Sequence, residues 1–180
     1  MGEWNGTGYV KNENIKYKFV KGNKMRIIIL FILISLTACN QANHREEINN
    51  TLDSLHYFAS MADQENYINL FSSNAVFFGT DIAERWPIEE FKTYVKSRFD
   101  TGTGWTYKKN SRNIYIAKDH KTAWFDELVE NKSYGEFRGT GVLVIEKNKW
   151  KISQYNLLLP IPNDYLQKYA NEIKKYYSKN

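Results

Sequence analysis

Two adjacent carboxylates in the middle of the chain are the first candidates for chemistry. Asp126 and Glu127 lie in the run TAWFDELVE, which has the composition of a strand. Successive side chains of a strand point to opposite faces, so only one of the two can face the interior. Glu127 shares its face with Ala123, Phe125 and Val129, the more core-like set, and we predict that Glu127 points inward. A carboxylate in a dry interior has a raised pKa and can carry protons.

Two later strand-like runs offer polar partners for Glu127. Alternation along these runs places four polar side chains on the faces that we expect to point inward: Arg138, Thr140, Gln154 and Asn156. An inward Arg138 near Glu127 would form a buried ion pair, which is the usual way to keep either charge inside a protein. Such a pair would serve structure as well as it would serve catalysis, and the sequence leaves both interpretations open.

Other catalytic chemistries have little support in the sequence. His44, His56 and His120 fall in a tether, a helix and a turn, without the spacing of metal ligands. There is no nucleophile elbow and no Ser-His-Asp order. The two GTG runs, 102–104 and 139–141, do not open a helix after a strand, as a phosphate-binding loop does. We therefore predict no metal and no cofactor.

The charge distribution argues against a nucleic-acid partner. The formal net charge of the 180-residue chain is +5. Residues 1–38 hold six basic and two acidic side chains, whereas the remainder holds 19 basic and 18 acidic ones. Because the excess of positive charge lies in the leader, we expect no large phosphate-binding patch on the body of the protein.

A short apolar run near the N-terminus ends at the one cysteine of the chain. Lys21, Lys24 and Arg26 precede an apolar run of 12 residues, 27–38, which is shorter than the roughly 20 residues of a membrane span. The following LTAC, residues 36–39, resembles the lipobox of bacterial lipoproteins. That resemblance implies diacylation of Cys39 and a lipid-anchored protein of the cell envelope, at the outer membrane or the outer face of the plasma membrane.

The leader also sets the expected domain boundaries. Met25 begins a signal of ordinary length, so we favour translation from Met25 over Met1. We expect residues 1–24 to be a non-mature extension and residues 25–38 to be the signal peptide. The remaining segments are a tether (39–43), a folded domain (44–160) and a C-terminal helix (161–180).

Helical patterns come first in the folded domain and strand patterns follow. Apolar residues recur at helical spacing over 48–62 and 88–99, with a short helix and a buried strand (75–78) between them. Four strand-like runs come next, separated by gaps of hairpin length: 105–117, 122–130, 136–146 and 150–159. This order predicts an α+β fold in which helices cover one face of a curved antiparallel sheet.

The order of elements resembles the nuclear transport factor 2-like superfamily. The segments AVFFGTDIAERW, TAWFDE and GEFRGTGVLVIEKNKWKISQYN carry the resemblance, which covers about residues 43–158 and is nearest to the SnoaL-like and ketosteroid-isomerase-like branches. It implies a cone-shaped sheet wrapped around the N-terminal helices, a pocket at the wide end and, often, a homodimer. The C-terminal helix is an addition to that fold.

The resemblance also implies roles for individual residues. In ketosteroid-isomerase-like enzymes a general-base aspartate follows the strand that corresponds to 75–78, which implicates Asp81 here. An oxyanion donor from the first helix would be Tyr57. Trp86, five residues after Asp81, is expected to line the pocket. The alternative for Asp81, which we favour, is a loop cap that accepts hydrogen bonds from backbone amides.

Three functions are compatible with these features. The first, which we favour, is a pocket that binds a small, partly apolar molecule. The second is an acid–base enzyme of isomerase, cyclase or dehydratase type, with Glu127 or Asp81 as proton carrier. The third is an assembly module that dimerises through the outer face of the sheet. Since one fold serves many roles, the site has to decide among them.

Overall fold

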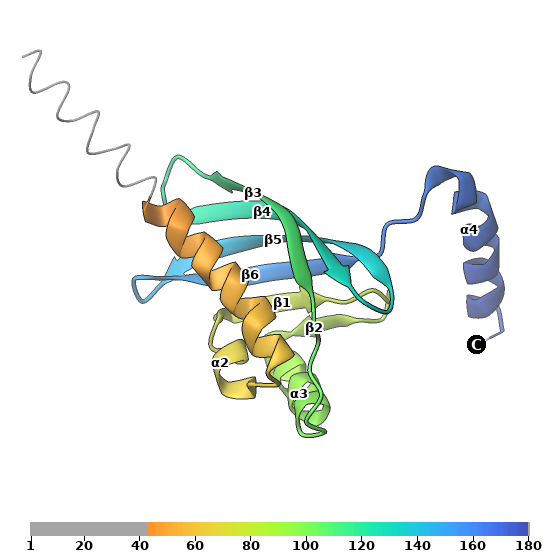
Figure 1. Ribbon diagram of the computed structural model, residues 1–180, viewed down its shortest axis with the longest axis horizontal. Coiled ribbons are helices and arrows are strands. Elements are labelled where there is room, and N and C mark those ends of the chain that lie inside the picture. The colour runs from red at the N-terminus through yellow and green to blue at the C-terminus, as the bar shows by residue number, and fades with distance from the viewer. Residues whose placement is uncertain (1–42, 180) are drawn as a thin grey trace, which may run out of the picture. The chain divides into compact units, whose positions relative to one another are not determined.

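The computed structural model describes residues 43–179 (Figure 1). A first helix covers residues 43–60 and is followed by the short helix α2 (Gln64–Ile68). The remaining elements are β1 (Phe71–Phe78), β2 (Arg85–Pro87), α3 (Ile88–Phe99), β3 (Lys108–Ile116), β4 (Thr122–Asn131), β5 (Gly135–Glu146), β6 (Lys149–Leu158) and α4 (Asn163–Tyr177). Prolines mark two of the helix starts, because Pro87 and Pro162 directly precede α3 and α4.

The six strands form one sheet in the order β2-β1-β6-β5-β4-β3. β3 to β6 pair antiparallel in sequence order, as the hairpin-length gaps predicted. β1 is longer than expected and pairs parallel with β6, and its other edge pairs with the unpredicted strand β2.

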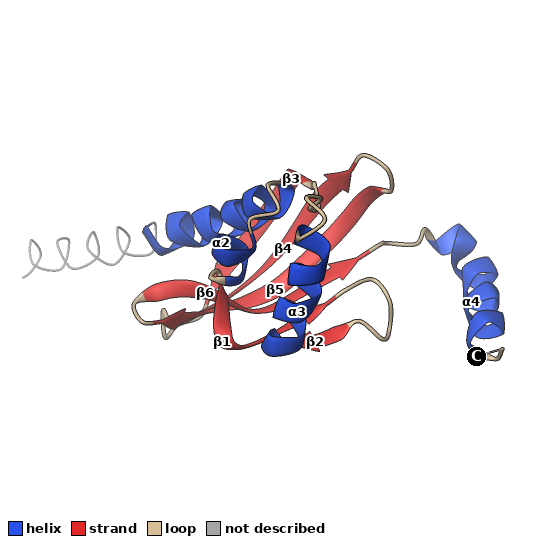
Figure 2. Ribbon diagram, turned by 90° about the horizontal axis from the view of Figure 1, so that it is seen from below, coloured by secondary structure: helices blue, strands red, loops and turns tan. Residues whose placement is uncertain are grey.

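Three helices lie over one face of the sheet. Figures 1 and 2 show the first helix, α2 and α3 on that face, which confirms the predicted α+β arrangement. The core forms between the two layers. It contains Ile48, Leu52, Leu55 and Ala59 of the first helix, Phe91, Val95 and Phe99 of α3, and Phe125, Leu143 and Ile152 of the sheet.

α4 lies away from the sheet in both views (Figures 1 and 2) and buries no residue. It exposes Leu166, Tyr169 and Ile173, which share the apolar face predicted for it. No helix within residues 43–179 is long and apolar enough to cross a membrane. The predicted signal peptide and Cys39 lie outside the described residues.

Candidate functional site

A cavity of about 490 Å³ opens between the helices and the sheet. The first helix contributes Leu55, His56 and Ala59 to its wall, and the end of the sheet contributes Phe137, Tyr155 and Leu157. The other walls come from α2, α3 and the segments that flank them: Tyr67, Phe77, Trp86, Phe91, Tyr94, Trp105 and Tyr107. The volume lies within the range of small-molecule sites in proteins, about 300–1,000 Å³.

Aromatic rings make most of this wall. The ring of Trp86 stacks on Tyr94 at a centroid distance of 4.4 Å, and Tyr94 stacks on Trp105 at 5.8 Å. Phe77 stacks on Phe91 at 4.2 Å and on Tyr155 at 5.5 Å. Rings that are already stacked on each other are held in place, so the wall is preformed.

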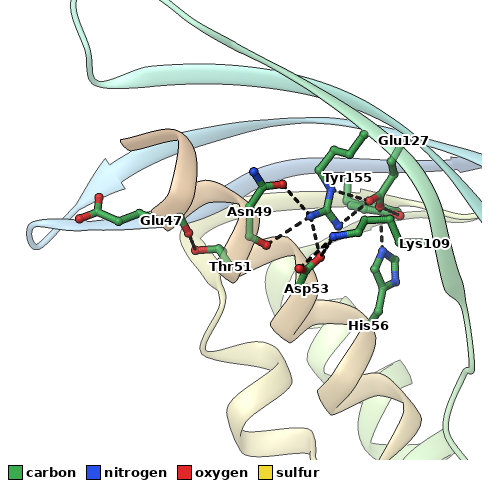
Figure 3. Close-up of polar contacts among 9 residues, drawn as sticks. Glu47, Asn49, Thr51, Asp53, His56, Lys109, Glu127 and Tyr155 are labelled. Atoms are coloured by element: carbon green, nitrogen blue, oxygen red, sulfur yellow. Dashed lines mark hydrogen bonds and ion pairs between the residues drawn. The ribbon is translucent and has the colours of Figure 1, made fainter. Parts of the chain in front are cut away.

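Glu127 is the most deeply buried charged residue of the domain, with 1% of its surface exposed. Its Oε1 accepts hydrogen bonds from Tyr155 Oη (2.8 Å) and His56 Nε2 (2.9 Å), as Figure 3 shows. Its Oε2 lies 2.8 Å from Arg112 Nε and 2.7 Å from Arg112 Nη2. The predicted inward orientation of Glu127 is therefore confirmed. Three donors hydrogen-bond its carboxylate, and Arg112 Nη2 adds an ion-pair contact without a hydrogen bond of its own.

These donors decide the charge of Glu127. Burial opposes ionisation, but the hydrogen bond and the charge of His56, together with Arg112 and Tyr155, hold the pKa of Glu127 below its ordinary value. Burial alone would raise this pKa, and the donors reverse the direction of the shift. Tyr155 behaves in the opposite way. Burial and the neighbouring Glu127 raise its pKa well above the ordinary value, so it stays a neutral donor.

Arg112 links this cluster to the first helix. Its side chain is 2% exposed, and its Nη1 donates to Asp53 Oδ1 (2.7 Å) and to the backbone oxygen of Asn49 (3.2 Å). Lys109 also pairs with Asp53, at 2.7 Å. Burial raises the pKa of Asp53, but Lys109 and Arg112 more than offset this and lower it. Two cations and two carboxylates thus compensate each other (Figure 3).

Two glycines of β5 leave the space that this cluster needs. A Cβ atom at Gly139 would lie 2.5 Å from Tyr155 Oη and 2.9 Å from Glu127 Cγ. A Cβ atom at Gly141 would lie 2.7 Å from the Phe125 ring. A side chain at Gly139 would therefore collide with groups of the cluster, and one at Gly141 would collide with a core ring and with the neighbouring strand β6, so glycine is required for packing at both positions.

The predicted ion pair between Glu127 and Arg138 was wrong. Glu127 lies opposite Gly139 in the β4–β5 pairing, and Arg138 lies opposite Leu128 on the other face, where it is exposed. The inward face of β5 carries Phe137, Gly139, Gly141 and Leu143, the reverse of the set that we predicted. The two faces of β5 both carry aliphatic side chains, so hydrophobicity does not distinguish them clearly. The prediction chose the wrong face because it did not count glycine as a core residue. The partner of Glu127 is Arg112, directly opposite it in the β3–β4 pairing.

The inward positions assigned to Gln154 and Asn156 were also wrong. Trp150 and Ile152 are buried as predicted, but the β5–β6 register shifts after Ile152. This β-bulge inserts one residue, so Tyr155 turns inward while Gln154 becomes exposed and Asn156 half-buried. Thr140 is half-buried on the same outer face of the sheet, away from the cavity.

The residues implied by the family resemblance divide between the cavity and the surface. Trp86 lines the cavity. Tyr57 is 60% exposed and does not line it, which contradicts its place in the pocket. Asp81 is exposed and outside the wall, and its Oδ1 accepts a hydrogen bond from the Ala83 amide (2.8 Å). It therefore has the geometry of the loop cap that we favoured.

Sequence reasoning missed His56, Arg112 and Tyr155 as members of the site. The helical period that places Leu52 and Ala59 inward also brings His56 to that side. Strand alternation places Arg112 on the face of the buried Ile114, and the short β3–β4 turn pairs it with Glu127. The sequence therefore contained the patterns that place His56 and Arg112 inward, but no pattern in it indicated the β-bulge that turns Tyr155 inward.

The described residues offer little to a metal ion. Within 43–179, no group of three His, Cys, Asp or Glu side chains is arranged to hold one. One carboxylate, Glu84, lines the cavity, and the buried carboxylate behind the wall, Glu127, is engaged by His56, Tyr155 and Arg112.

Comparisons with solved structures agree with this fold. A nuclear transport factor 2-like protein of unknown function from Pseudomonas putida aligns with a TM-score of 0.59 at 14% identity, over 69% of this chain and 91% of its own. A proposed ketosteroid isomerase from Parabacteroides distasonis aligns with a TM-score of 0.52 at 17% identity, over 64% and 86% of the two chains. A proposed dehydratase of the nuclear transport factor 2-like family from Streptomyces avermitilis aligns with a TM-score of 0.59 at 9% identity, over 67% and 99%.

At these identities the structures show the fold alone. A search of curated proteins found no match to this chain. The model of the SnoaL-like domain family matches residues 48–162, which is more than half of the sequence and includes the cavity and the Glu127 cluster. The chain therefore belongs to the SnoaL-like domain family.

Proposed function

We propose that this protein binds a small, partly apolar molecule in its cavity. The observation that carries the proposal is the preformed aromatic wall around about 490 Å³, with a few polar groups at defined places. Cavities that combine apolar walls with a small number of fixed polar groups are typical small-molecule sites. The stacked rings of Trp86, Tyr94 and Trp105 favour a flat ligand, because flat molecules pack best against ring faces.

The polar groups of the wall indicate the rest of the ligand. His56, Tyr107 and Tyr155 can hydrogen-bond to it, while the cation Arg98 is offset by the carboxylate Glu84. The Oε2 atom of Glu84 already accepts the Asp81 amide at 3.1 Å. Since the wall has no net charge, we expect an uncharged ligand that carries hydrogen-bonding groups on an apolar frame.

An acid–base enzyme that uses Glu127 or Asp81 as its proton carrier has less support. Glu127 does not line the cavity, and Asp81 is exposed in a loop. Neither carboxylate contacts the space that a substrate would occupy. Binding is therefore the function that the cavity supports best.

Native mass spectrometry of the purified full chain tests the proposal. We expect a co-purified molecule, or 1:1 uptake of the uncharged, flat fluorophore N-phenyl-1-naphthylamine when the cavity is empty. Trp86→Leu should weaken this binding by at least about tenfold, because about 1.4 kcal/mol of ring contact is lost. Trp124→Leu is the matched control, since Trp124 is 47% exposed and does not line the cavity. Equal binding by both variants would contradict the proposal.

We also propose that binding takes place at the cell envelope, with acylated Cys39 as anchor. The support is the lipobox-like LTAC at residues 36–39 and the basic, apolar leader before it.

A homodimer is a second proposal, supported by the outer face of the sheet. Tyr115 and Trp124 stack there at 5.7 Å, and each is 47% exposed. Exposed aromatic pairs are enriched at protein interfaces. The same mass spectra report the oligomeric state, and Trp124→Lys should convert a dimer to a monomer.

A further inference from the structure

Two tight turns, β3–β4 and β5–β6, meet the start of the first helix at one end of the sheet (Figure 1). His44, in the first turn of that helix, stacks on His120 of the β3–β4 turn at a centroid distance of 6.3 Å. It also accepts a hydrogen bond of 3.2 Å from Nε1 of Trp150, which lies just after the β5–β6 turn. The amide of Ile145 donates to the backbone oxygen of Lys121 at 3.0 Å, so the two turns are neighbours.

Four lysines make this end of the domain basic. Lys118 and Lys121 belong to the β3–β4 turn, while Lys147 and Lys149 belong to the β5–β6 turn and its flank, and all four are exposed. Within residues 43–179, none of the four ammonium groups forms an ion pair or a hydrogen bond. We call these four lysines the basic end.

The two carboxylates of the same turns are engaged by the protein. Asp119 accepts the amides of Lys121 (2.9 Å) and Thr122 (3.1 Å). Glu146 accepts the amide and the hydroxyl of Ser73, at 3.0 and 3.1 Å. The start of the helix contributes charges of both signs: Arg45, Glu46 and Glu47. The available positive charge therefore lies in the lysines of the two turns.

The mouth of the cavity lies at the opposite end of the strands. Its exposed lining residues include Thr80 of the β1–β2 loop, Tyr134 of the β4–β5 turn and Leu159, which follows β6. β4 has 10 residues and runs from the β3–β4 turn to the β4–β5 turn, so roughly 30 Å of strand separates the basic end from the mouth.

The proposed anchor is close to the basic end in the sequence. Four Cα–Cα steps separate Cys39 from residue 43, where the described helix begins, and such a segment spans at most about 14 Å. An acylated Cys39 would keep the start of the helix within that distance of the lipid headgroups. Charges act on a lipid surface over a Debye length, about 8–10 Å at moderate ionic strength. The lysines are therefore placed to reach the headgroups.

We propose that the basic end binds anionic phospholipid headgroups of the membrane that holds Cys39. This inference rests on the proposed anchor and goes beyond it, because the anchor alone limits the distance of the domain from the membrane but not its orientation. Binding through the basic end turns the cavity mouth toward the aqueous phase. The ligand of the cavity then enters from water and not from the bilayer.

Lysine acetylation on vesicles tests this orientation. The lipidated protein is purified from a bacterial host, its lipid is verified by mass, and it is placed in vesicles of phosphatidylcholine alone or with an equal amount of phosphatidylglycerol. A water-soluble acetylating reagent should modify the basic end at least about fivefold more slowly on the anionic vesicles, the equivalent of about 1 kcal/mol. Lys132, in the β4–β5 turn beside the mouth, should react equally on both. Concentrated salt should remove the difference, because it screens the attraction.

Two double variants separate the basic end from the net charge of the protein. Lys121→Gln combined with Lys149→Gln should reduce the slowing at the two remaining lysines to less than about twofold. Lys108→Gln combined with Lys132→Gln is the matched control. It removes the same charge near the mouth, because Lys108 lies opposite Glu130 at the far end of the β3–β4 pairing, and it should keep the full slowing.

Three results would overturn the inference. Equal acetylation of the basic end on both kinds of vesicle, by a protein that floats with them, would exclude the binding of headgroups and leave the anchor intact. Equal slowing of Lys132 and the basic end would show that the domain lies on the lipid without this orientation. A protein that carries no lipid and does not float with neutral vesicles would overturn the anchor, and this inference with it.

Discussion

At the scale of single residues, the cluster around Glu127 joins a helix and three strands through one carboxylate. His56 comes from the first helix, Arg112 from β3 and Tyr155 from β6. A buried ion is tolerated only when its partners satisfy it, so each donor protects the fold from an unpaired charge. The contacts that stabilise the cluster also hold His56 and Tyr155 in place at the cavity wall.

Removal of Arg112 should be far more damaging than removal of Arg138. Arg112→Met leaves Glu127 with an uncompensated charge, and we expect the free energy of unfolding to fall by about 3–5 kcal/mol. Arg138→Met changes an exposed residue and should stay within about 0.5 kcal/mol of the unmodified chain. Urea denaturation at pH 7 measures both. Similar losses in the two variants would show that Glu127 does not depend on Arg112.

The lowered pKa of Glu127 predicts a loss of stability in acid. A group whose pKa is lower in the folded state contributes stability above its ordinary pKa, here 4.5, and loses it as the pH falls through the folded value. The free energy of unfolding should therefore fall below about pH 4.5, and Glu127→Gln should show a flatter profile there. Asp53, with a lowered pKa of its own, is present in both proteins, so the difference isolates Glu127. Parallel profiles in urea titrations from pH 7 to pH 3 would contradict this.

At the scale of elements, strand β5 packs against the Glu127 cluster through Gly139, which has no side chain to occupy the space of Tyr155 and Glu127. Gly139→Ala puts a methyl group 2.5 Å from Tyr155 Oη, so the ring or the strand must move. We expect a loss of about 1–3 kcal/mol in unfolding free energy, the usual range for overpacking. Thr140→Ala, on the outer face of the same strand, is the control and should cost little. A Gly139→Ala protein of unchanged stability would show that the backbone relaxes freely there.

The elements were predictable from the sequence, but the faces of two strands were not. Hydrophobic periodicity and turn residues predicted the helices, the four-strand meander and the inward side of β4. On β5 two of the inward positions, Gly139 and Gly141, are glycines, which carry no hydrophobic signal. The side chains of Tyr155 and Phe125 fill the space beside them. On β6 a bulge after Ile152 exchanges the two faces, and bulges depend on pairing with neighbours that one strand does not specify.

The site was partly predictable for the same reasons. Glu127 and Trp86 followed from local pattern and from the family resemblance. Arg112 could have been found by pairing β3 and β4 across their short turn, since Ile116 opposite Ala123 fixes Arg112 opposite Glu127. Tyr155 could not, because its inward position exists only through the bulge in β6. The sequence indicates which residues form strands, but it leaves open the register in which each strand pairs with its neighbours.

At the scale of the whole molecule, the proposed binding site and the proposed lipid anchor fall in separate parts of the chain. The cavity and its supporting cluster are built from residues within 48–162, the part matched by the SnoaL-like model. The exposed helix α4 follows the last strand and buries nothing. Cys39 precedes the family match, so the proposed anchor can be changed without touching the site.

Cys39→Ser should therefore release the protein from the membrane and leave ligand binding intact. Two acyl chains hold a protein stably, since each buried methylene contributes about 0.8 kcal/mol, and serine offers no sulfur for the diacylglyceryl group. In a bacterial host, mass spectrometry of the wild-type protein should show a diacylated N-terminal cysteine, and cell fractionation should place this protein with the membranes. The variant should lack the lipid and leave the membrane fraction, unless its uncleaved leader keeps it there. N-terminal sequencing of the variant shows whether its leader has been cleaved. A Cys39 without lipid in the wild-type protein would disprove the anchor.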